Sequence, residues 1–423
     1  MLPATAPTTE LHAAQLARVR TLLATLTGNA FYSRKFEGIR AEDIRTPGDF
    51  AKLPFTTKAE LAADQCEHPP YGTNLSYPIE RYSRLHQTSG TSTGQPLRWL
   101  DTAESWEWVL GCWREYFRLM RLQDGDRLFF PFSFGPFLGF WSAFDAAARS
   151  GFLSIPGGGM SSIARLRCLL EHRCTVLFAT PTYALHLAEV AAKEGIDIAG
   201  SAVRAVVVAG EPGGNIPATR ERIEKVWNAR VFDHYGMTEV GPVAVEADDR
   251  PGQMYLLESE YLAEVVDPAT GREVPAGEPG ELILTNLGRV GSPLIRYRTG
   301  DLVRVATDSD PSGRTWRRLE GGILGRVDDM IHVRGNNLYP SAIEAIVRRF
   351  PEVAEYRLYV DQTNPLADLR LEVEPLSGDG RELAEAVARA VRAELLFRVE
   401  VTPAPPGSLP RFEMKARRVV HQK

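Results

Sequence analysis

Residues 87–96 (QTSGTSTGQP) concentrate five hydroxyl side chains and two glycines. A run of this composition that ends on proline is a poor helix and a poor strand, so we predict a loop here. Glycine lets backbone N–H groups converge on one point, and the hydroxyls add donors, which together suit phosphate oxygens. The same composition is also typical of a flexible linker. The segment is not a Walker A loop, because only three residues separate Gly90 from Gly94 and no Lys-Ser/Thr pair follows.

Two downstream segments carry groups that could complete a nucleotide site. Residues 210–212 (GEP) and 233–239 (DHYGMTE) are both predicted to follow strands. Ligands of open α/β sheets bind beyond the carboxyl ends of strands. There, Tyr235 can stack on a purine and Thr238 can donate to a phosphate. Glu239 can hold Mg²⁺, which usually takes one or two carboxylates plus phosphate oxygens.

Three more segments place charged groups beside turns. Residues 297–301 (YRTGD) end on Asp301, whose carboxylate suits a bidentate grip on ribose hydroxyls. Residues 325–331 (GRVDDMI) combine charge with glycine and could form a hinge, although such a run is usually only solvated. Residues 410–415 (PRFEMK) end on Lys415, which taken alone would be an ordinary surface lysine.

Composition excludes several functional classes. Of 423 residues, 44% are hydrophobic and 24% charged, as expected of a globular chain with two or three domains. A formal charge of −5 gives no basic field for nucleic acid, and no apolar run approaches the ~20 residues that span a bilayer. Residues 1–10 do not resemble a signal peptide and four cysteines are too few for a disulfide scaffold, so we expect a cytoplasmic protein.

Repeated strand–helix pairs predict an α/β fold with parallel sheets. The expected helices are 11–26, 103–120, 161–172, 181–194 and 215–228, and the expected strands are 97–99, 127–132, 152–155, 175–179, 205–209 and 230–233. Thr57 is predicted to cap a further helix. Between these elements, glycines among the aromatic residues 133–141 favour a bent wall around a flat ligand rather than a regular element.

The last third of the chain changes pattern twice. Residues 253–305 contain short alternating strands split by turns, which predicts a small antiparallel β unit. After Gly325, strands at 355–361, 368–374 and 398–402 accompany two amphipathic helices. This predicts a large multi-subdomain N-terminal domain at 1–324, a hinge at 325–328 and a small mobile α+β domain at 329–423.

Together these segments resemble the ANL adenylate-forming superfamily, in which motifs of this kind occur in the same order. The closer likeness is to bacterial phenylacetate–CoA ligases, which also carry segments like 29–36 (NAFYSRKF) and 53–58 (LPFTTK). The resemblance covers nearly the whole chain, and five ordered motifs are far more specific than any one. It implies that a carboxylate attacks ATP to give an acyl-adenylate and pyrophosphate. The small domain then rotates and the thiol of coenzyme A attacks the adenylate.

The resemblance also assigns roles residue by residue. The phosphate loop would comprise Thr88, Ser89, Gly90, Thr91, Ser92, Thr93 and Gly94. Of the remaining ATP/AMP-binding residues, Gly210, Glu211, Pro212, Asp233 and Tyr235 would frame adenine, and Asp301 and Arg326 would bind ribose. The others would be His234, Gly236, Met237 and Thr238. The catalytic residues would be Lys415, at the carboxylate and α-phosphate, Thr238, at the α-phosphate, and Glu239, which would bind Mg²⁺. Asp328 matches the hinge position and Gly335 the pantetheine tunnel.

The acyl pocket is where this sequence departs from its relatives. The resemblance places Phe132, Phe134 and Phe137 along the ring pocket, with Gly236, Met237 and Pro242 opposite. None of these residues is basic, which favours a flat, largely apolar acid such as phenylacetate or a benzoate. Relatives usually carry Tyr where Phe132 stands and an aliphatic residue where His234 stands. His234 could therefore bind a polar ring substituent or make a structural hydrogen bond.

We thus expect an aryl-acid–CoA ligase that uses ATP, Mg²⁺ and coenzyme A and that forms, as relatives often do, a homodimer. One alternative is an adenylating enzyme that passes the acyl group to a carrier protein, an amine or a deazaflavin cofactor. Another is a degenerate protein that binds adenylate without turnover. The presence of Glu239, Asp301, Arg326 and Lys415 argues against the second.

Overall fold

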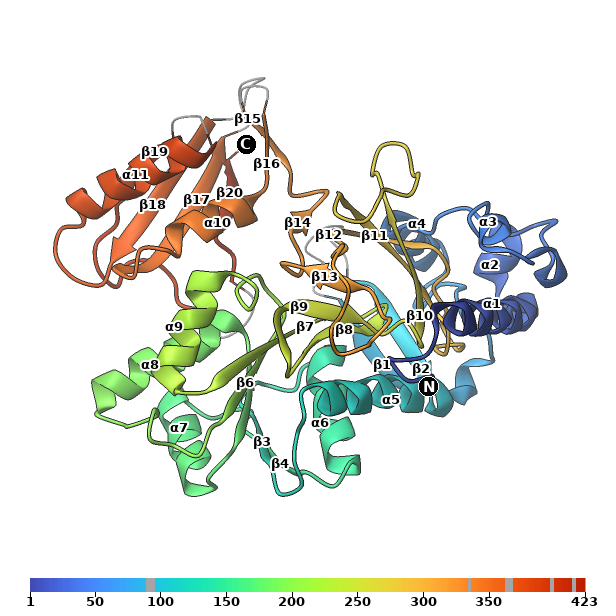
Figure 1. Ribbon diagram of the computed structural model, residues 1–423, viewed down its shortest axis with the longest axis horizontal. Coiled ribbons are helices and arrows are strands. Elements are labelled where there is room, and N and C mark those ends of the chain that lie inside the picture. The colour runs from blue at the N-terminus through green and yellow to red at the C-terminus, as the bar shows by residue number, and fades with distance from the viewer. Residues whose placement is uncertain (89–95, 334–335, 362–367, 396–398, 413–415, 423) are drawn as a thin grey trace. The chain divides into compact units, whose positions relative to one another are not determined.

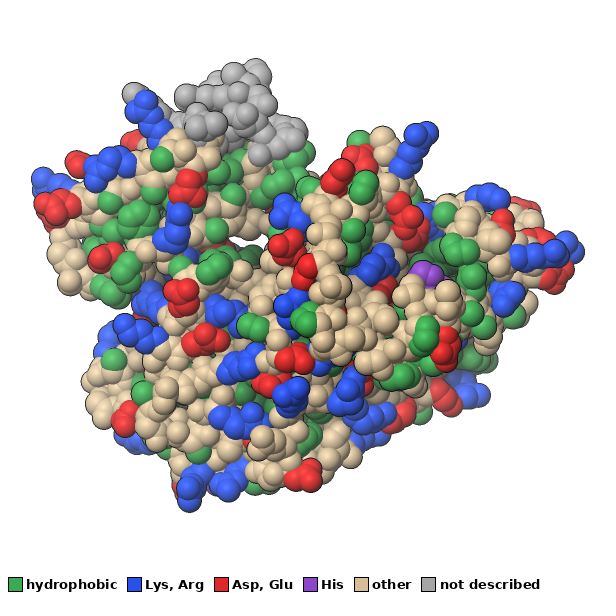
Figure 2. All heavy atoms as spheres, viewed as in Figure 1, with side chains coloured by type: hydrophobic (Ala, Val, Ile, Leu, Met, Phe, Trp, Pro, Cys, Tyr) green, Lys and Arg blue, Asp and Glu red, His purple; other side chains and the backbone are tan. Residues whose placement is uncertain are grey.

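The computed structural model describes residues 1–88, 96–333, 336–361, 368–395, 399–412 and 416–422. The chain divides into two units, one of residues 1–159 with 232–322 and the other of residues 160–231 with 323–423. Among the described residues, no helix is long and apolar enough to cross a membrane. On the face seen in Figure 2, acidic and basic side chains are interspersed, in keeping with the small net charge.

Helices and strands alternate along most of the chain (Figure 1). The helices are α1 Thr8–Ala24, α2 Ala30–Lys35, α3 Pro47–Phe50, α4 Lys58–Glu67, α5 Ala103–Leu119, α6 Leu138–Arg149, α7 Ser162–Glu171, α8 Pro181–Glu194, α9 Pro217–Trp227, α10 Pro340–Val347 and α11 Arg381–Leu395. Short 3-10 helices are η1 Thr25–Gly28, η2 Ala41–Asp43 and η3 Ile79–Arg81. The strands are β1 Tyr82–Gln87, β2 Arg98–Thr102, β3 Arg127–Phe130, β4 Leu153–Pro156, β5 Val176–Ala179, β6 Ala205–Val208, β7 Arg230–Met237, β8 Gly241–Ala247, β9 Arg250–Leu256, β10 Tyr261–Val266, β11 Pro279–Asn286, β12 Tyr297–Arg304, β13 Arg318–Glu320, β14 Gly325–Arg326, β15 Ile331–Val333, β16 Asn336–Leu338, β17 Val353–Asp361, β18 Asp368–Pro375, β19 Glu400–Pro403 and β20 Val419–Gln422.

In the first unit, β1 and β2 pair antiparallel with Gln87 opposite Arg98, so the hydroxyl-rich segment joins two strands as predicted. β3 and β4 pair in parallel. β7 pairs with β8, β8 with β9, and β9 with β13, and all three pairs are antiparallel. β10, β11 and β12 form an antiparallel sheet, which confirms the small β unit expected at 253–305.

In the second unit, β5 and β6 pair in parallel and alternate with α7, α8 and α9, as the βα pattern predicts. The later part of this unit is the C-terminal sheet, in which the strand order is β19-β18-β17-β20. β17 pairs antiparallel with β18 and parallel with β20.

The core of the C-terminal sheet follows the two hydrophobic periods of its sequence. Leu358 and Val360 alternate along β17, whereas Val387 and Val391 recur at helical spacing in α11, and all four are fully buried. Alternation by two buries one strand face and spacing by four buries one helix stripe. Local pattern and tertiary burial therefore agree in this part of the chain.

Two predictions were wrong in detail. The segment 133–141 is irregular only to Phe137, after which α6 begins at Leu138. The small residues Ser142, Ala143, Ala146 and Ala147 bury one face of this helix, which outweighs the glycine in its first turn. The segment 233–237 does not follow a strand but continues it, because β7 runs to Met237 and pairs with β8.

His234 packs where β7 meets α5. Its ring meets Trp113 edge-on at a centroid distance of 4.8 Å and Tyr116 in a tilted arrangement at 5.6 Å. The residue is partly buried, and its Nδ1 is buried with no hydrogen-bond partner among the described residues. Burial disfavours the imidazolium and lowers the pKa of His234 to about 3.

This packing predicts acid sensitivity that His234→Leu should relieve. An unfolded histidine takes up a proton near pH 6.5, whereas folded His234 stays neutral until about pH 3. The unfolded state therefore binds more protons below about pH 6.5, and the stability that His234 contributes is lost as the pH falls from there. Between pH 7.5 and pH 5, the wild type should lose about 1–2 kcal/mol more free energy of unfolding than the variant. Urea denaturation at both pH values measures this, and equal losses would contradict it.

Candidate functional site

The base of the hydroxyl-rich loop is closed by Thr88. Its N–H donates to the Leu97 carbonyl at 2.9 Å, and its hydroxyl accepts the Leu97 N–H at 3.0 Å. The preceding residue, Gln87, donates its N–H to the Pro136 carbonyl at 2.7 Å. Thr88 thus fixes the two ends of the loop, and Gln87 ties its start to the aromatic segment. Ser89, Gly90, Thr91, Ser92, Thr93 and Gly94 lie outside the described residues.

A buried ion pair is formed by a residue of β2, the strand that follows the hydroxyl-rich segment. Asp101 on β2 accepts two hydrogen bonds from Arg289, from Nε and Nη2, each at 2.6 Å, and both side chains are fully buried. The third guanidinium nitrogen, Nη1, donates to the Thr238 carbonyl at 2.7 Å. One arginine therefore links the strand that leaves the loop to the β7–β8 turn.

The geometry of this pair keeps the Asp101 carboxylate ionised. Burial alone would raise the pKa of Asp101, but the charges and hydrogen bonds of Arg289 and His86 together outweigh burial, and the net pKa is lowered. His86 adds a weaker contact, with Nδ1 3.7 Å from Asp101 Oδ2. A bidentate guanidinium–carboxylate pair is the arrangement that best offsets the cost of taking both charges out of water.

Glu239 stands in the β7–β8 turn and is buried. Tyr297 on β12 donates its hydroxyl to Glu239 Oε1 at 2.9 Å, and Lys58 Nζ lies 3.8 Å from the same oxygen. Lys58 is the first residue of α4, whose start is fixed by Thr57, as predicted: the Thr57 hydroxyl accepts the Glu60 N–H. The carboxylate is thus oriented by groups from two other elements.

Asp301 is buried and is held by the predicted purine-stacking residue. Tyr235 on β7 donates its hydroxyl to Asp301 Oδ2 at 2.6 Å. The pairing of β11 with β12 shifts register here, so residues 299–301 form a bulge. Gly300 takes a φ of +73° in this bulge, which a residue with a Cβ adopts only under strain. The bulge lets Asp301 meet a side chain 66 positions earlier in the sequence.

Gly236 is fixed by a close approach between strands. A Cβ at this position would lie 2.6 Å from the Gly241 carbonyl oxygen and 3.1 Å from Pro242 Cα. Gly236 pairs with Pro242, and Met237 with Gly241, just past a register shift in β7. The three residues predicted to face the phenylalanines therefore share one hairpin. Asp233, on the same strand, is buried and donates its N–H to Glu246 at 3.2 Å.

The predicted ring-pocket phenylalanines form one aromatic cluster. Phe132 stacks on Phe140 with centroids 4.3 Å apart and contacts Phe134 at 5.6 Å. Phe137 meets Phe140 edge-on at 5.9 Å. All four rings are partly buried, so the cluster keeps some apolar surface accessible. Phe140, from the first turn of α6, is a member that the sequence did not assign.

In the second unit, Glu211 lies with Gly210 and Pro212 between β6 and α9. Its Oε1 accepts the Thr182 N–H at 2.8 Å, near the start of α8, and its Oε2 accepts the Ala416 N–H at 2.8 Å. Gly210 takes a φ of +90°. The adenine-framing role of residues 210–212 stays a prediction.

Arg326 and Asp328, the predicted ribose ligand and hinge residue, form an exposed ion pair. Nε and Nη2 of Arg326 lie 2.8 and 3.1 Å from the two carboxylate oxygens of Asp328. Gly335 and Lys415 lie outside the described residues, so their roles stay predictions.

Asp101, Arg289, Tyr297 and Lys58 were not assigned to the site from the sequence. Asp101 and Arg289 are 188 positions apart, and neither belongs to a motif. Tyr297 opens the YRTGD segment and Lys58 ends the LPFTTK segment, so position within recognised motifs was the available signal for these two.

Comparison with known proteins identifies the family of this chain. The AMP-binding enzyme family matches residues 87–288, and the AMP-binding enzyme C-terminal domain matches residues 335–423. The phenylacetate-coenzyme A ligase of Thermus thermophilus is 31% identical over 98% of this chain and 97% of its own. The enzyme of the same name from Escherichia coli is 31% identical over 98% of this chain and 95% of its own.

A solved structure extends the likeness to the fold. The crystal structure of 2-hydroxyisobutyryl-CoA ligase in the postadenylation state, in complex with 2-HIB-AMP, matches with a TM-score of 0.93 at 29% identity, covering 99% of this chain and 91% of that one. The predicted fold class, an α/β N-terminal region followed by a small α+β domain, is confirmed. The chain therefore belongs to the ANL superfamily of adenylate-forming AMP-binding enzymes, among its acyl-CoA ligases.

Proposed function

We propose that this enzyme is an ATP-dependent aryl-acid–CoA ligase that works through an acyl-adenylate and releases AMP and pyrophosphate. The observation that carries the proposal is the joint orientation of two buried carboxylates. Asp301 accepts a hydrogen bond from the Tyr235 hydroxyl, and Glu239 accepts one from the Tyr297 hydroxyl. Buried carboxylates held by tyrosine hydroxyls suit ribose and phosphate-bound metal better than they suit apolar packing.

The first half-reaction needs charge compensation more than proton transfer. A carboxylate is already a nucleophile at neutral pH, so its approach to the α-phosphate is opposed mainly by like charge. Thr238 would donate to the α-phosphate, and Lys415 would offset the charge of the carboxylate and phosphate. Positioned donors and cations of this kind supply most of the rate in phosphoryl and nucleotidyl transfer.

Glu239 fits a Mg²⁺ ligand. Mg²⁺ in nucleotide sites is usually held by one or two carboxylates together with phosphate oxygens. The residues that the structure describes contain no group of three or more Asp, Glu, His or Cys side chains arranged for a metal, so a site completed by ATP suits this chain. When bound, Mg²⁺ would supply charge that offsets the leaving pyrophosphate. Tyr297 would keep Glu239 Oε1 oriented, and Lys58 would balance the carboxylate.

Two findings support an aromatic acid. The cluster of Phe132, Phe134, Phe137 and Phe140 presents partly exposed apolar rings. Two relatives of nearly equal length are named phenylacetate-coenzyme A ligases. A small hydroxy acid is the second candidate, for two reasons. The buried Nδ1 of His234 has no hydrogen-bond partner within the described part of the chain, and a structure at 29% identity is named for 2-hydroxyisobutyryl-CoA.

The domain scheme belongs to the same proposal. Residues 1–324 would bind the acid and ATP, residues 325–328 would be the hinge, and residues 329–423 would rotate between the half-reactions. Gly335 would then border the pantetheine tunnel. We further expect a cytoplasmic homodimer.

A pyrophosphate-release screen tests the proposal directly. Aryl acids, including phenylacetate and benzoate, and short aliphatic and hydroxy acids would each be supplied with ATP and Mg²⁺, with and without coenzyme A. Acid-dependent pyrophosphate release that yields an aryl thioester supports the proposal. Adenylation without thioester formation would indicate another acceptor, and no release with any acid would indicate a protein that only binds adenylate.

Lys415→Ala should separate the two half-reactions. Because Lys415 is expected to act on the carboxylate and α-phosphate, the variant should lose carboxylate-dependent ATP–pyrophosphate exchange by at least about a hundredfold. It should still convert a supplied acyl-adenylate to the thioester. Lys225→Ala, which removes an exposed lysine of α9, is the matched control and should keep both activities. Unimpaired exchange in Lys415→Ala would overturn the assignment.

Asp328→Pro should have the opposite effect. Proline restricts φ and so hinders rotation about the proposed hinge, which should spare exchange and slow thioester formation. Asp328→Ala loses the same ion pair to Arg326 but keeps backbone freedom, and it should retain both steps. Stopped-flow measurement of each half-reaction gives the comparison, and an equal loss of both steps in Asp328→Pro would rule out the hinge.

A further inference from the structure

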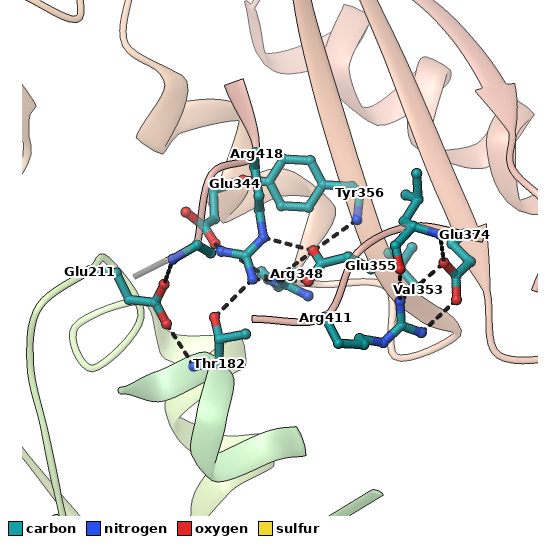
Figure 3. Close-up of polar contacts among 12 residues, drawn as sticks. Thr182, Glu211, Glu344, Arg348, Val353, Glu355, Tyr356, Glu374, Arg411 and Arg418 are labelled. Carbon is teal, nitrogen blue, oxygen red and sulfur yellow. Dashed lines mark hydrogen bonds and ion pairs between the residues drawn. The ribbon is translucent and has the colours of Figure 1, made fainter. Parts of the chain in front are cut away.

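Arg418 joins the C-terminal sheet to helix α8 within the second unit (Figure 3). Its guanidinium donates to both carboxylate oxygens of Glu355 on β17, at 2.7 and 3.1 Å, and to Glu344 on α10 at 3.3 Å. Nη2 also donates to the Thr182 hydroxyl on α8 at 2.8 Å. The side chain is buried, so these bonds are not diluted by solvent.

The Arg418 guanidinium is positioned by groups of the C-terminal sheet and of α10. Burial opposes the charged form of Arg418, but Glu344 and Glu355 outweigh it and raise the arginine pKa, so the residue stays ionised. The Arg418 carbonyl accepts the Leu358 N–H at 2.8 Å, and its guanidinium lies 5.4 Å from the Tyr356 ring. Because the Arg418 side chain is already fixed, its hydrogen bond to Thr182 costs little conformational entropy beyond that of ordering the Thr182 hydroxyl.

Glu211 makes a second link two residues earlier in the C-terminal segment. One carboxylate oxygen of Glu211 accepts the Thr182 N–H (Figure 3). The other accepts the Ala416 N–H. Ala416 directly follows Lys415 in the sequence. The predicted adenine-framing segment therefore holds the neighbour of the predicted catalytic lysine.

The charged groups at this junction also keep partners on their own side. Arg418 would keep Glu355 if the Thr182 bond broke, and Glu211 would keep the Thr182 N–H if Ala416 left. Arg411 repeats the pattern, since it lies 3.8 Å from Glu189 of α8 but 2.5 Å from Glu374 of its own sheet. Opening such a contact leaves no buried charge without a partner. An ordinary buried ion pair is costly to open because it leaves a charge unpaired.

We propose that Thr182 and Glu211 form a separable latch with Arg418 and Ala416, which positions the segment beside Lys415 for adenylate formation and opens for thioester transfer. The inference rests on the proposed function, because it assigns the latch to one of the two half-reactions. Thr182, Glu211 and Arg418 are positioning residues in it. Their bonds change the population of the arrangement that forms the adenylate, not the chemistry at phosphorus.

Thr182→Val is the decisive variant, because it removes one hydroxyl from α8 and leaves Arg418 paired with Glu355. A hydrogen bond to a charged donor is lost, so exchange of pyrophosphate should slow by up to about tenfold. Thioester formation from a supplied acyl-adenylate should stay within about twofold, because the latch is open in that step. The thermal midpoint of unfolding should not change.

Thr219→Val is the matched control. Thr219 lies on α9 in the same unit, and its buried hydroxyl has no hydrogen-bond partner among the described residues, so the same chemical change breaks no bond. Both half-reactions should keep wild-type rates. Equal slowing of both steps in Thr182→Val, or no slowing of exchange, would overturn the latch while leaving the ligase assignment intact.

Hydrogen exchange tests the latch independently of any substrate. In the free enzyme, a peptic peptide containing Ala416 should exchange faster in Thr182→Val than in Thr219→Val, while peptides from α11 should not differ. If no acid supports pyrophosphate exchange in the wild type, the proposed function fails. The latch is then tested by hydrogen exchange alone. Identical exchange at Ala416 in the two variants would then refute the latch.

Discussion

The ion pair between Asp101 and Arg289 is the interaction on which the candidate site in the first unit depends. Both side chains are fully buried, and every nitrogen of the guanidinium is used: two bind the carboxylate and the third binds the Thr238 carbonyl. Losing one partner of such a pair typically costs about 3–5 kcal/mol, because the other charge stays buried and unpaired. The hairpin that carries the hydroxyl-rich loop and the turn that carries Glu239 are thereby held at one fixed separation.

The other polar contacts extend this constraint to the groups that are proposed to contact ATP. Thr238 is held through its backbone, so its hydroxyl is not used by the ion pair. Glu239 lies beside Lys58 and accepts the Tyr297 hydroxyl, and Asp301 accepts the Tyr235 hydroxyl. These contacts set the direction of each carboxylate. The candidate site is rigid because the ion pair that supports it is fully buried.

Features that depend on neighbouring residues were predicted from the sequence, whereas contacts between residues far apart in the sequence were not. The strand that follows the hydroxyl-rich segment, the cap at Thr57 and the βα repeats were predicted from composition and spacing to within a few residues. The order of short motifs predicted the family. Asp101 and Arg289 could not be paired, because nothing in either neighbourhood marks a partner 188 positions away.

Tertiary burial also decided the two elements that were wrong. Gly236 and Met237 have the composition of a turn, yet pairing with β8 keeps them in β7. The aromatic and glycine mixture before residue 141 argued against a helix, yet the small-residue face of α6 is buried. In both places a neighbouring element supplied contacts that intrinsic preference does not contain.

Two kinds of buried charge therefore serve different purposes in this chain. Asp101 and Arg289 are each other's principal partner, so separating them would leave two uncompensated charges, and the pair makes a permanent joint. Arg418 and Glu211 each bond across the junction between α8 and the C-terminal sheet while keeping a partner on their own side. The difference lies in where the neutralising group is placed, not in the strength of any one bond. Under the proposed function, the two half-reactions need different arrangements. The buried pair would then keep the proposed nucleotide site constant, and the proposed latch would let the segment that follows Lys415 separate from α8.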